Sequence, residues 1–408
     1  MNQKYLDNYI NIILKIGLNL QPGQNLVINS PLECEDIVHQ IVDRAYQMGA
    51  NKVVVDWNDP ELTKLRYKYE DIKHFETIED FAIARSEYFV DTNSCFLSLD
   101  GLDSQALSGI DHDKLSVWQQ TVHRLLNKKD EAIMNDLVSW CIVAVPTKKW
   151  AMEVFPNDED SVNKLWDMIF KMTRCDNDDP IKAWEDHINH LQTYAKIIND
   201  HNFTSLYFVN EKGTGLNVGL VKDYQFLAAN SINHTNNQPF IANIPTEEVY
   251  SMPDKRNVNG KVYSSKPLSY HGNIIDDFYL EFKDGRVIDA KAEVGDEMLQ
   301  SMLNTDEGSR SLGEVALVSY HTPISLSNIL FYTTLYDENA SCHLALGKAY
   351  PTTVKNGENL SKEELDQLGC NDSAIHVDFM FGTHDMNIYG IKEDGSQVQI
   401  FKDGDFCI

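Results

Sequence analysis

The chain has 408 residues, which is more than one hydrophobic core of ordinary size holds, so we expect two domains. Hydrophobic residues make up 42% and charged residues 24%, as is typical of a soluble globular protein. The formal net charge of −27 argues against nucleic acid and anionic membranes as partners, because both bind patches of lysine and arginine. It suits a cytoplasmic protein and would attract cationic ligands such as free amines, although solubility alone also explains it.

The N-terminal segment predicts an amphipathic helix and not a signal peptide. Leu6, Ile10 and Ile13 mark one apolar face, whereas Asp7 and Lys15 interrupt any continuous apolar core. No stretch of the chain approaches the roughly 18 apolar residues of a membrane span. The seven cysteines are scattered and contain no C-x-x-C, which is typical of reduced, cytoplasmic proteins and excludes zinc-finger spacing.

The first half alternates predicted strands and helices. A short apolar strand at 25–30, a helix at 35–48 and an apolar run at 52–57 make a βαβ unit. The segments 88–92 (YFVDT) and 140–146 (WCIVAVP) predict further buried strands. The first βα turn, NSPLECED, lacks both G-x-G-x-x-G and G-K-[ST], which argues against dinucleotide or P-loop nucleotide binding.

The second half has the pattern of β-hairpins. An acidic stretch (174–180) and a predicted helix (181–200) form a connector, and alternating runs then flank the turn Asp284-Gly285. The segment 388–401 repeats this pattern.

These patterns predict two domains of different class. We expect residues 1–195 to form an α/β domain with a largely parallel sheet. We expect residues 196–408 to form a mixed α+β domain that is mainly antiparallel.

Several polar clusters have ordinary explanations. His187 and His190 lie three apart on a predicted helix, but there is no H-E-x-x-H motif, so a solvated helix face is expected. His384 and Asp385 follow a glycine in a predicted turn, where a solvated pair is expected. Cys342 adjoins a histidine on a predicted strand, where neighbouring side chains face opposite ways, so a Cys–His dyad is not expected.

The segment AIHVDFMFGT (374–383) is harder to explain by structure alone. It predicts a buried strand, yet it contains His376 and Asp378, which lie two apart and therefore share one face. Valine or isoleucine would satisfy a buried strand equally well.

The second half offers partners for this pair, each beside a short apolar run. They are Glu247, Glu248, Glu314, Glu338, His343 and Tyr350. Buried carboxylates cost several kcal/mol unless they are paired or bind a metal, and lysine and arginine are sparse in these segments. Four carboxylates with two neutral imidazoles would balance two divalent cations. The alternative is a set of unrelated surface acids and two core histidines, and spacing alone does not exclude it.

Four blocks of sequence resemble the M29 family of metallo-aminopeptidases, the aminopeptidase T and aminopeptidase S group. They are IPTEEVYSMPDKRNVNGKV, SRSLGEVALV, YDENASCHLALGKAYP and HVDFMFGT, in the family's order and with about its spacing. The first half also resembles that group's N-terminal α/β domain, so the likeness covers nearly the whole chain.

The resemblance implies a dinuclear metal site in the C-terminal domain. Its ligands would be Glu248, Glu314, Glu338, His343, His376 and Asp378. Tyr350 would hydrogen-bond the tetrahedral oxyanion, and Glu247 would be either a partner of the ligands or the general base. The family further implies two divalent ions (Co, Zn or Mg), a cytoplasmic location and a homodimer.

We therefore expect an aminopeptidase that releases the first residue of short peptides with a free N-terminus. The two metals would activate a water for attack on the scissile carbonyl, and Glu247 or Glu314 would carry the proton. One alternative is a dinuclear hydrolase of another amide or ester. Another is a metal-binding protein without activity.

Overall fold

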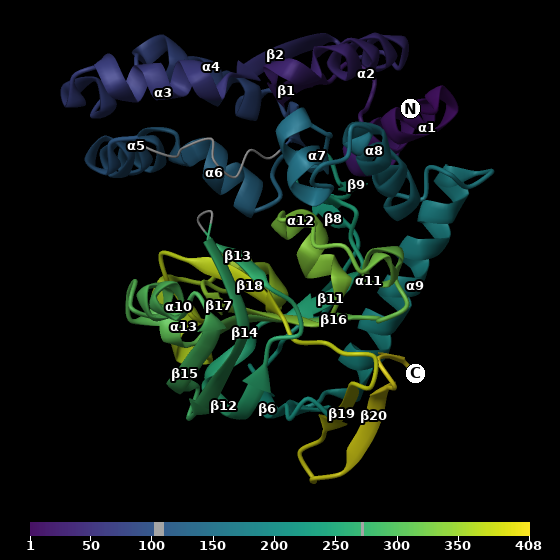
Figure 1. Cartoon of the computed structure of the whole chain (residues 1–408), viewed down its shortest axis with the longest axis vertical. Helices are drawn as coiled ribbons and strands as arrows, with labels where there is room; N and C mark the ends of the chain where they lie inside the picture. The colour runs from purple at the N-terminus through teal and green to yellow at the C-terminus, as the bar shows by residue number, and fades with distance from the viewer. Residues whose placement is uncertain (102–109, 271–272) are drawn as a thin grey trace. The chain divides into compact units, whose positions relative to one another are not determined.

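The computed structural model describes residues 1–101, 110–270 and 273–408 (Figure 1). Its contacts divide the chain into two compact units, residues 1–184 with 230–245 and residues 185–229 with 246–408. These units interleave along the sequence, which a single boundary at residue 195 does not describe. No helix among the described residues is long and apolar enough to span a membrane.

The first unit contains a parallel sheet with the strand order β10-β4-β3-β1-β2. Its strands are β1 (Asn25–Pro31), β2 (Lys52–Asn58), β3 (Cys95–Asp100), β4 (Trp140–Ala144) and β10 (Asn243–Ile244); β8 (Ser231–Asn233) and β9 (Gln238–Phe240) pair separately. The helices are α1 (Gln3–Ile12), α2 (Glu35–Gln47), α3 (Pro60–Tyr69), α4 (Asp80–Asp91), α5 (His112–Leu125), α6 (Asn127–Met134), α7 (Lys148–Val154) and α8 (Ser161–Met172). The predicted βαβ unit is confirmed as β1, α2 and β2, because β1 and β2 pair in parallel. The buried residues of α2 recur at helical spacing, so the helix buries one apolar face.

The prediction of a strand at 88–92 is wrong. These residues form the last turn of α4 and its C-cap, and the strand follows later as β3. The upstream sequence DFAIARSE is rich in helix formers, and only Phe89 of the apolar run is deeply buried. A short apolar run does not by itself distinguish a strand from a helix.

The second unit contains two antiparallel sheets, as predicted for this half. The smaller sheet has the order β18-β17-β16-β11-β7, with bounds β7 (Leu227–Ala228), β11 (Glu248–Ser251), β16 (Leu312–Val318), β17 (His343–Gly347) and β18 (His376–Met380). The larger sheet comprises β5 (Ser205–Val209), β6 (Gly215–Leu220), β12 (Pro253–Tyr263), β13 (Leu268–Tyr270), β14 (Asn273–Lys283), β15 (Arg286–Val294), β19 (Asn387–Ile391), β20 (Gln397–Lys402) and β21 (Asp405–Phe406). The remaining helices are α9 (Pro180–His201), in which the boundary between the units falls, and α10 (Asp296–Leu303), α11 (Pro323–Ser327), α12 (Thr334–Asp337) and α13 (Lys362–Leu368).

Both predicted hairpins are present in the larger sheet. Asp284 and Gly285 have positive φ (+48° and +80°), as a two-residue turn between twisted strands requires. Buried residues of both sheets, among them Leu280 of β14, Leu344 of β17 and Phe379 of β18, belong to one apolar cluster. The two sheets of this unit therefore share a core.

A β-bulge at Gly313 sets the direction of the side chain that follows it. Leu312 pairs with Leu346 but Glu314 pairs with Ala345, so β16 has one extra residue at this point. Paired residues share a face of the sheet, and Leu346 and Ala345 face opposite ways. The bulge thus turns Leu312 and Glu314 to opposite faces, although they lie only two residues apart.

We predict that Gly313→Ala destabilises the fold by about 1–3 kcal/mol, the usual cost of overpacking. A Cβ at this position would lie 2.4 Å from the carbonyl oxygens of Gly347 and Lys348. Gly215→Ala is the matched control, because its nearest neighbour, the Tyr207 hydroxyl, would be 3.7 Å away. Denaturant unfolding of the metal-free protein measures both, and equal stability of the two variants would contradict this packing.

Candidate metal centre

One face of the smaller sheet gathers five polar side chains from four neighbouring strands. Glu314 and Asp378 both pair with Ala345 of the strand between them, so the three residues form a row across the sheet. His343 and His376 lie two residues from members of this row and share its face. Glu248 joins them because its partner, Val318, lies four residues beyond Glu314 on β16.

The five side chains form two groups that share Glu314. His343 Nε2 lies 3.1 Å from Glu248 Oε2 and 3.5 Å from Glu314 Oε1. His376 Nε2 lies 3.7 Å from Glu314 Oε2 and 3.4 Å from Asp378 Oδ1. Each group brings three potential ligand atoms within 4.8 Å of one another, the spacing that a bound cation needs. Glu314 therefore directs one oxygen to each group.

Backbone contacts orient both imidazoles toward these carboxylates. His343 Nδ1 lies 3.2 Å from the Ser341 carbonyl oxygen, and His376 Nδ1 lies 2.6 Å from that of Lys348. A carbonyl oxygen only accepts, so in the neutral rings the proton is on Nδ1 and the lone pair is on Nε2. This arrangement is the one by which proteins orient metal-binding histidines.

The donor set fits a divalent metal ion. Asp378 is buried, and its Oδ1 has no hydrogen-bond partner among the described residues. A buried carboxylate oxygen without a hydrogen bond is costly even with His376 Nε2 at 3.4 Å, and a cation would satisfy it. Carboxylates and imidazoles without thiolates suit Zn, Co, Mn or Mg.

Glu338 lies near this cluster but outside the two groups. It begins the 3₁₀ turn that follows α12, and its neighbour Asn339 donates a long hydrogen bond (3.5 Å) to its Oε1. Burial, and then the charges of Asp378 and Glu248, raise the pKa of Glu338 well above its ordinary value. The assignment of Glu338 as a ligand stays a prediction.

Without metal, the cluster holds protons on its histidines. Burial alone would lower the pKa of His376, but the adjacent Asp378 and Glu314 raise it to about 10. The pKa of His343 is likewise raised well above its usual value, because Glu248 and Glu314 outweigh burial. Burial raises the pKa of Glu314 to about 6, although its hydrogen bond with His343 opposes this.

Tyr350 lies beside the cluster, as the resemblance implied. Its ring centroid is 4.9 Å from that of His376, and it follows the Lys348 carbonyl that orients this histidine. Burial, and then the charges of Glu314 and Asp378, raise the pKa of the Tyr350 hydroxyl above its ordinary value. The hydroxyl therefore stays protonated and able to donate a hydrogen bond.

Sequence reasoning missed a contact between His187 and Glu247. His187 is not part of either metal-binding group, but its Nε2 lies 2.8 Å from the Thr246 carbonyl oxygen and 3.5 Å from Glu247 Oε2. The backbone N–H of Glu247 donates to Asn339 Oδ1 at 2.7 Å. Glu247 is therefore buried between α9 and the turn that carries Glu338. The only sequence signal was a histidine on the helix, and its partner lies about sixty positions away.

The other polar clusters are ordinary, as expected. His190 is exposed and stacks on Tyr194 at 5.6 Å. His384 is exposed beside Asp385. Cys342 contacts the backbone of Val318 through its Sγ, which gives it a partner other than a histidine.

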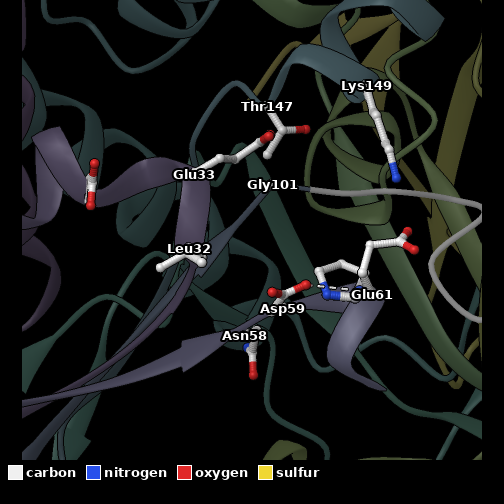
Figure 2. Close-up of a pocket in the computed structure, with 10 residues that line it drawn as sticks. Leu32, Glu33, Asn58, Asp59, Glu61, Gly101, Thr147 and Lys149 are labelled. Carbon is white, nitrogen blue, oxygen red and sulfur yellow. Dashed lines mark hydrogen bonds between the residues drawn. The ribbon is translucent and has the colours of Figure 1, made fainter. Parts of the chain in front are cut away.

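Apart from the metal-binding cluster of the second unit, the first unit contains a cavity of about 560 Å³ at the C-terminal ends of β1 to β4 (Figure 2). The strands β2 and β3 lie on opposite sides of β1, so the strand order reverses at β1. Ligands of open parallel sheets commonly bind at the C-terminal ends of the strands at such a point, which is where this cavity lies. Two of its four carboxylates serve local structure: Asp59 caps α3, and Glu33 accepts a hydrogen bond from the backbone N–H of Lys148. Among the described residues, none of its carboxylates belongs to a group spaced to hold a metal.

Comparisons with known proteins agree across the whole chain. The family model described as "Thermophilic metalloprotease (M29)" matches residues 2–406. The chain is 43% identical to Aminopeptidase 2 of Geobacillus stearothermophilus and 32% identical to Aminopeptidase T of Thermus aquaticus, in each case over 99% of this chain and 98% of the relative. The solved structure of wild-type AmpT from Thermus thermophilus has a TM-score of 0.91 and 31% identity, with full coverage of both chains.

We predict that metal binding releases protons. The folded-state pKa of His376 is about 10, above its ordinary value of about 6.5, so the metal-free protein carries this proton at neutral pH. The metal needs the neutral ring, so apparent affinity should rise about tenfold per pH unit for each proton released, up to about pH 10. Conversely, the stability that protonated His376 gives the metal-free fold is lost as pH rises through about 10.

Calorimetric titration with Zn in two buffers of different ionisation enthalpy measures the number of protons released. His384→Gln, at an exposed histidine outside the cluster, should release as many protons as the unmodified protein. Binding without proton release at pH 7 would contradict the protonated state assigned here.

Proposed function

The chain belongs to the M29 peptidase family and is a metal-dependent aminopeptidase, and we propose that it uses two metal ions to release the first residue of short peptides. The observation that carries the two-metal proposal is the position of Glu314, whose two oxygens face two separate ligand groups. Such a shared carboxylate would help to hold an ion in each group, and two ions would together polarise a carbonyl and activate a water.

The charge of the proposed ligand set also supports two divalent ions. Glu248, Glu314, Glu338 and Asp378 supply four negative charges, and His343 and His376 bind as neutral imidazoles. Two divalent cations balance this sum. Co, Zn and Mg remain the proposed identities, because the ligand types accept all three.

Each protein group has a role in peptide hydrolysis. When bound, the metals would lower the pKa of water and polarise the scissile carbonyl. Tyr350, which stays protonated, donates a hydrogen bond to the oxyanion of the tetrahedral intermediate. Both oxygens of Glu314 face the histidines, so of the two candidate proton carriers we favour Glu247, which His187 contacts.

The substrate we propose is a short peptide with a free N-terminus, and the surplus negative charge of the chain favours such a cation. Two alternatives have distinct signatures: a general amide or ester hydrolase would not require a free amine, and a non-catalytic protein would bind metal without turnover. A homodimer in the cytoplasm, implied by the resemblance, is part of the proposal, and light scattering of the purified protein tests the dimer.

We predict that chelator-stripped protein is inactive and that adding Co or Zn restores cleavage of a free tripeptide. The N-acetylated form of the same tripeptide should remain intact, because it has no ammonium group for the site to bind. Chromatography of the released amino acid measures both reactions. Cleavage of both peptides would favour the general hydrolase, and bound metal without cleavage of several free tripeptides would favour a non-catalytic protein.

We predict that Tyr350→Phe lowers kcat by about 100-fold or more, the usual effect of removing one oxyanion donor. Metal content should not change, because the ring that packs against His376 is retained. Tyr207→Phe, at an exposed tyrosine of β5, is the matched control. A normal kcat in Tyr350→Phe with full metal content would refute the oxyanion role.

A further inference from the structure

A buried side-chain amide lies behind the backbone group that orients His376. That group is the carbonyl oxygen of Lys348, which lies 2.6 Å from His376 Nδ1. Lys348 belongs to the short irregular segment after β17, and Tyr350 follows in the same segment. Whatever fixes this segment therefore bears on two groups of the proposed site, the imidazole of His376 and the hydroxyl of Tyr350.

The direction of the Lys348 carbonyl is set from the opposite side of the same peptide group. This carbonyl and the N–H of Ala349 belong to one planar trans peptide group, so they point in opposite directions. The N–H of Ala349 donates a hydrogen bond of 3.0 Å to the backbone carbonyl oxygen of Asn371. The peptide group is thus held by His376 on one side and by Asn371 on the other, and its direction depends on where Asn371 lies.

The side chain of Asn371 fixes that position through three hydrogen bonds. Its Nδ2 donates to the carbonyl oxygens of Gly308 (2.9 Å), Ser311 (3.1 Å) and Gly347 (2.7 Å). Asn371 is only 3% exposed, so water does not compete for these acceptors. The amide therefore ties the chain just before β18 to the chain before β16 and to the end of β17.

Neither regular structure nor packing on its outer side confines this part of the chain. Residues 370–375 lie in no helix or strand. A cavity of about 600 Å³ borders Lys348, Ala349 and Asn371, so close packing does not hold the segment from that side. Hydrogen bonds must supply the constraint that packing does not.

Asn371 and a second polar side chain divide this task. Asp306 anchors the chain nearer to β18 by accepting hydrogen bonds from the Ser373 hydroxyl and the Ala374 backbone N–H. Asn371 instead holds the residues on both sides of Lys348, one through its side chain and one through its backbone carbonyl.

We infer that Asn371 is a positioning residue of the proposed metal centre, because it keeps the Lys348 carbonyl oxygen directed at His376. The inference rests on the proposed function, since the ligand role of His376 is part of that proposal. An imidazole held at Nδ1 presents its Nε2 in a fixed direction, and removing such a partner of a metal-binding histidine commonly lowers metal affinity by about 10–100-fold.

The histidines of the two ligand groups are oriented separately. His376 depends on the carbonyl of Lys348, whereas His343 Nδ1 lies 3.2 Å from the carbonyl oxygen of Ser341. The acceptors of the Asn371 amide lie elsewhere, before β16 and at the end of β17. Loss of this amide should therefore weaken the group of His376 and spare the group of His343.

Asn371→Ala tests the inference by calorimetric titration of the chelator-stripped protein with Zn at pH 7, in competition with a chelator of known affinity. We expect the unmodified protein to bind two ions per chain. In Asn371→Ala the affinity for one ion should fall about tenfold or more, and the affinity for the other should stay within twofold. His376→Gln identifies which of the two binding steps belongs to the group of His376.

Asn371→Ser is a milder second variant. Its hydroxyl has one donor where the amide has two, so it should lose less affinity for the same ion than the alanine variant does. If Asn371→Ala does not fold, Asn371→Ser decides alone.

Asn199→Ala is the matched control. Asn199 of α9 lies in the same unit, and its amide forms two hydrogen bonds with the backbone of Phe226 (3.0 and 2.8 Å). Phe226 precedes β7, which lies at the opposite edge of the smaller sheet from β18. The control should unfold at a lower denaturant concentration than the unmodified protein while keeping both Zn affinities within twofold.

A loss confined to the binding step of His376 would support the inference, because a general loss of stability does not choose between two ligand groups. Equal losses at both steps, or no loss at either, would overturn it. Binding of fewer than two ions by the unmodified protein would instead refute the two-metal proposal.

Discussion

The concentration of negative charge on one buried face of a sheet is the constraint on which the rest of this unit depends. Glu314 and Asp378 lie in one row, and Glu248 and Glu338 raise the charge further. Desolvation and mutual repulsion of such groups cost several kcal/mol each without a counter-charge. Protons on the two histidines relieve part of this cost in the metal-free protein, and the proposed metals would replace those protons.

Regular antiparallel pairing alone would not have produced this arrangement. The ladder aligns Glu314 with Asp378 through Ala345, but only the bulge at Gly313 turns Glu314 to the face opposite Leu312. The segment after β17 then contributes two groups to the site. The carbonyl oxygen of Lys348 orients His376, and Tyr350 follows Lys348 by two residues. Backbone contacts thus fix the geometry of the proposed ligands before any metal binds, which is how rigid sites reduce reorganisation during a reaction.

The sequence was most informative where local pattern and structure coincide. Alternation in AIHVDFMFGT placed His376 and Asp378 on one inner face, and the turn residues marked the hairpins. It failed where distant contacts decide the outcome: residues 88–92 became helical because of the residues before them, and 230–245 joined the first unit through the pairing of β10 with β4. The contact of His187 with Glu247 was equally unreadable, since neither residue has a local pattern that identifies the other.

One face of β18 carries two proposed ligands and a buried apolar side chain. His376 and Asp378 bind in the proposed centre, and Met380, two residues further on, is buried on the same face. Met380 pairs with His343 of β17, so packing at this end of the strand also bears on the position of a third proposed ligand. A shift of β18 would move His376 and Asp378 relative to His343, and the close packing around Met380 opposes such a shift.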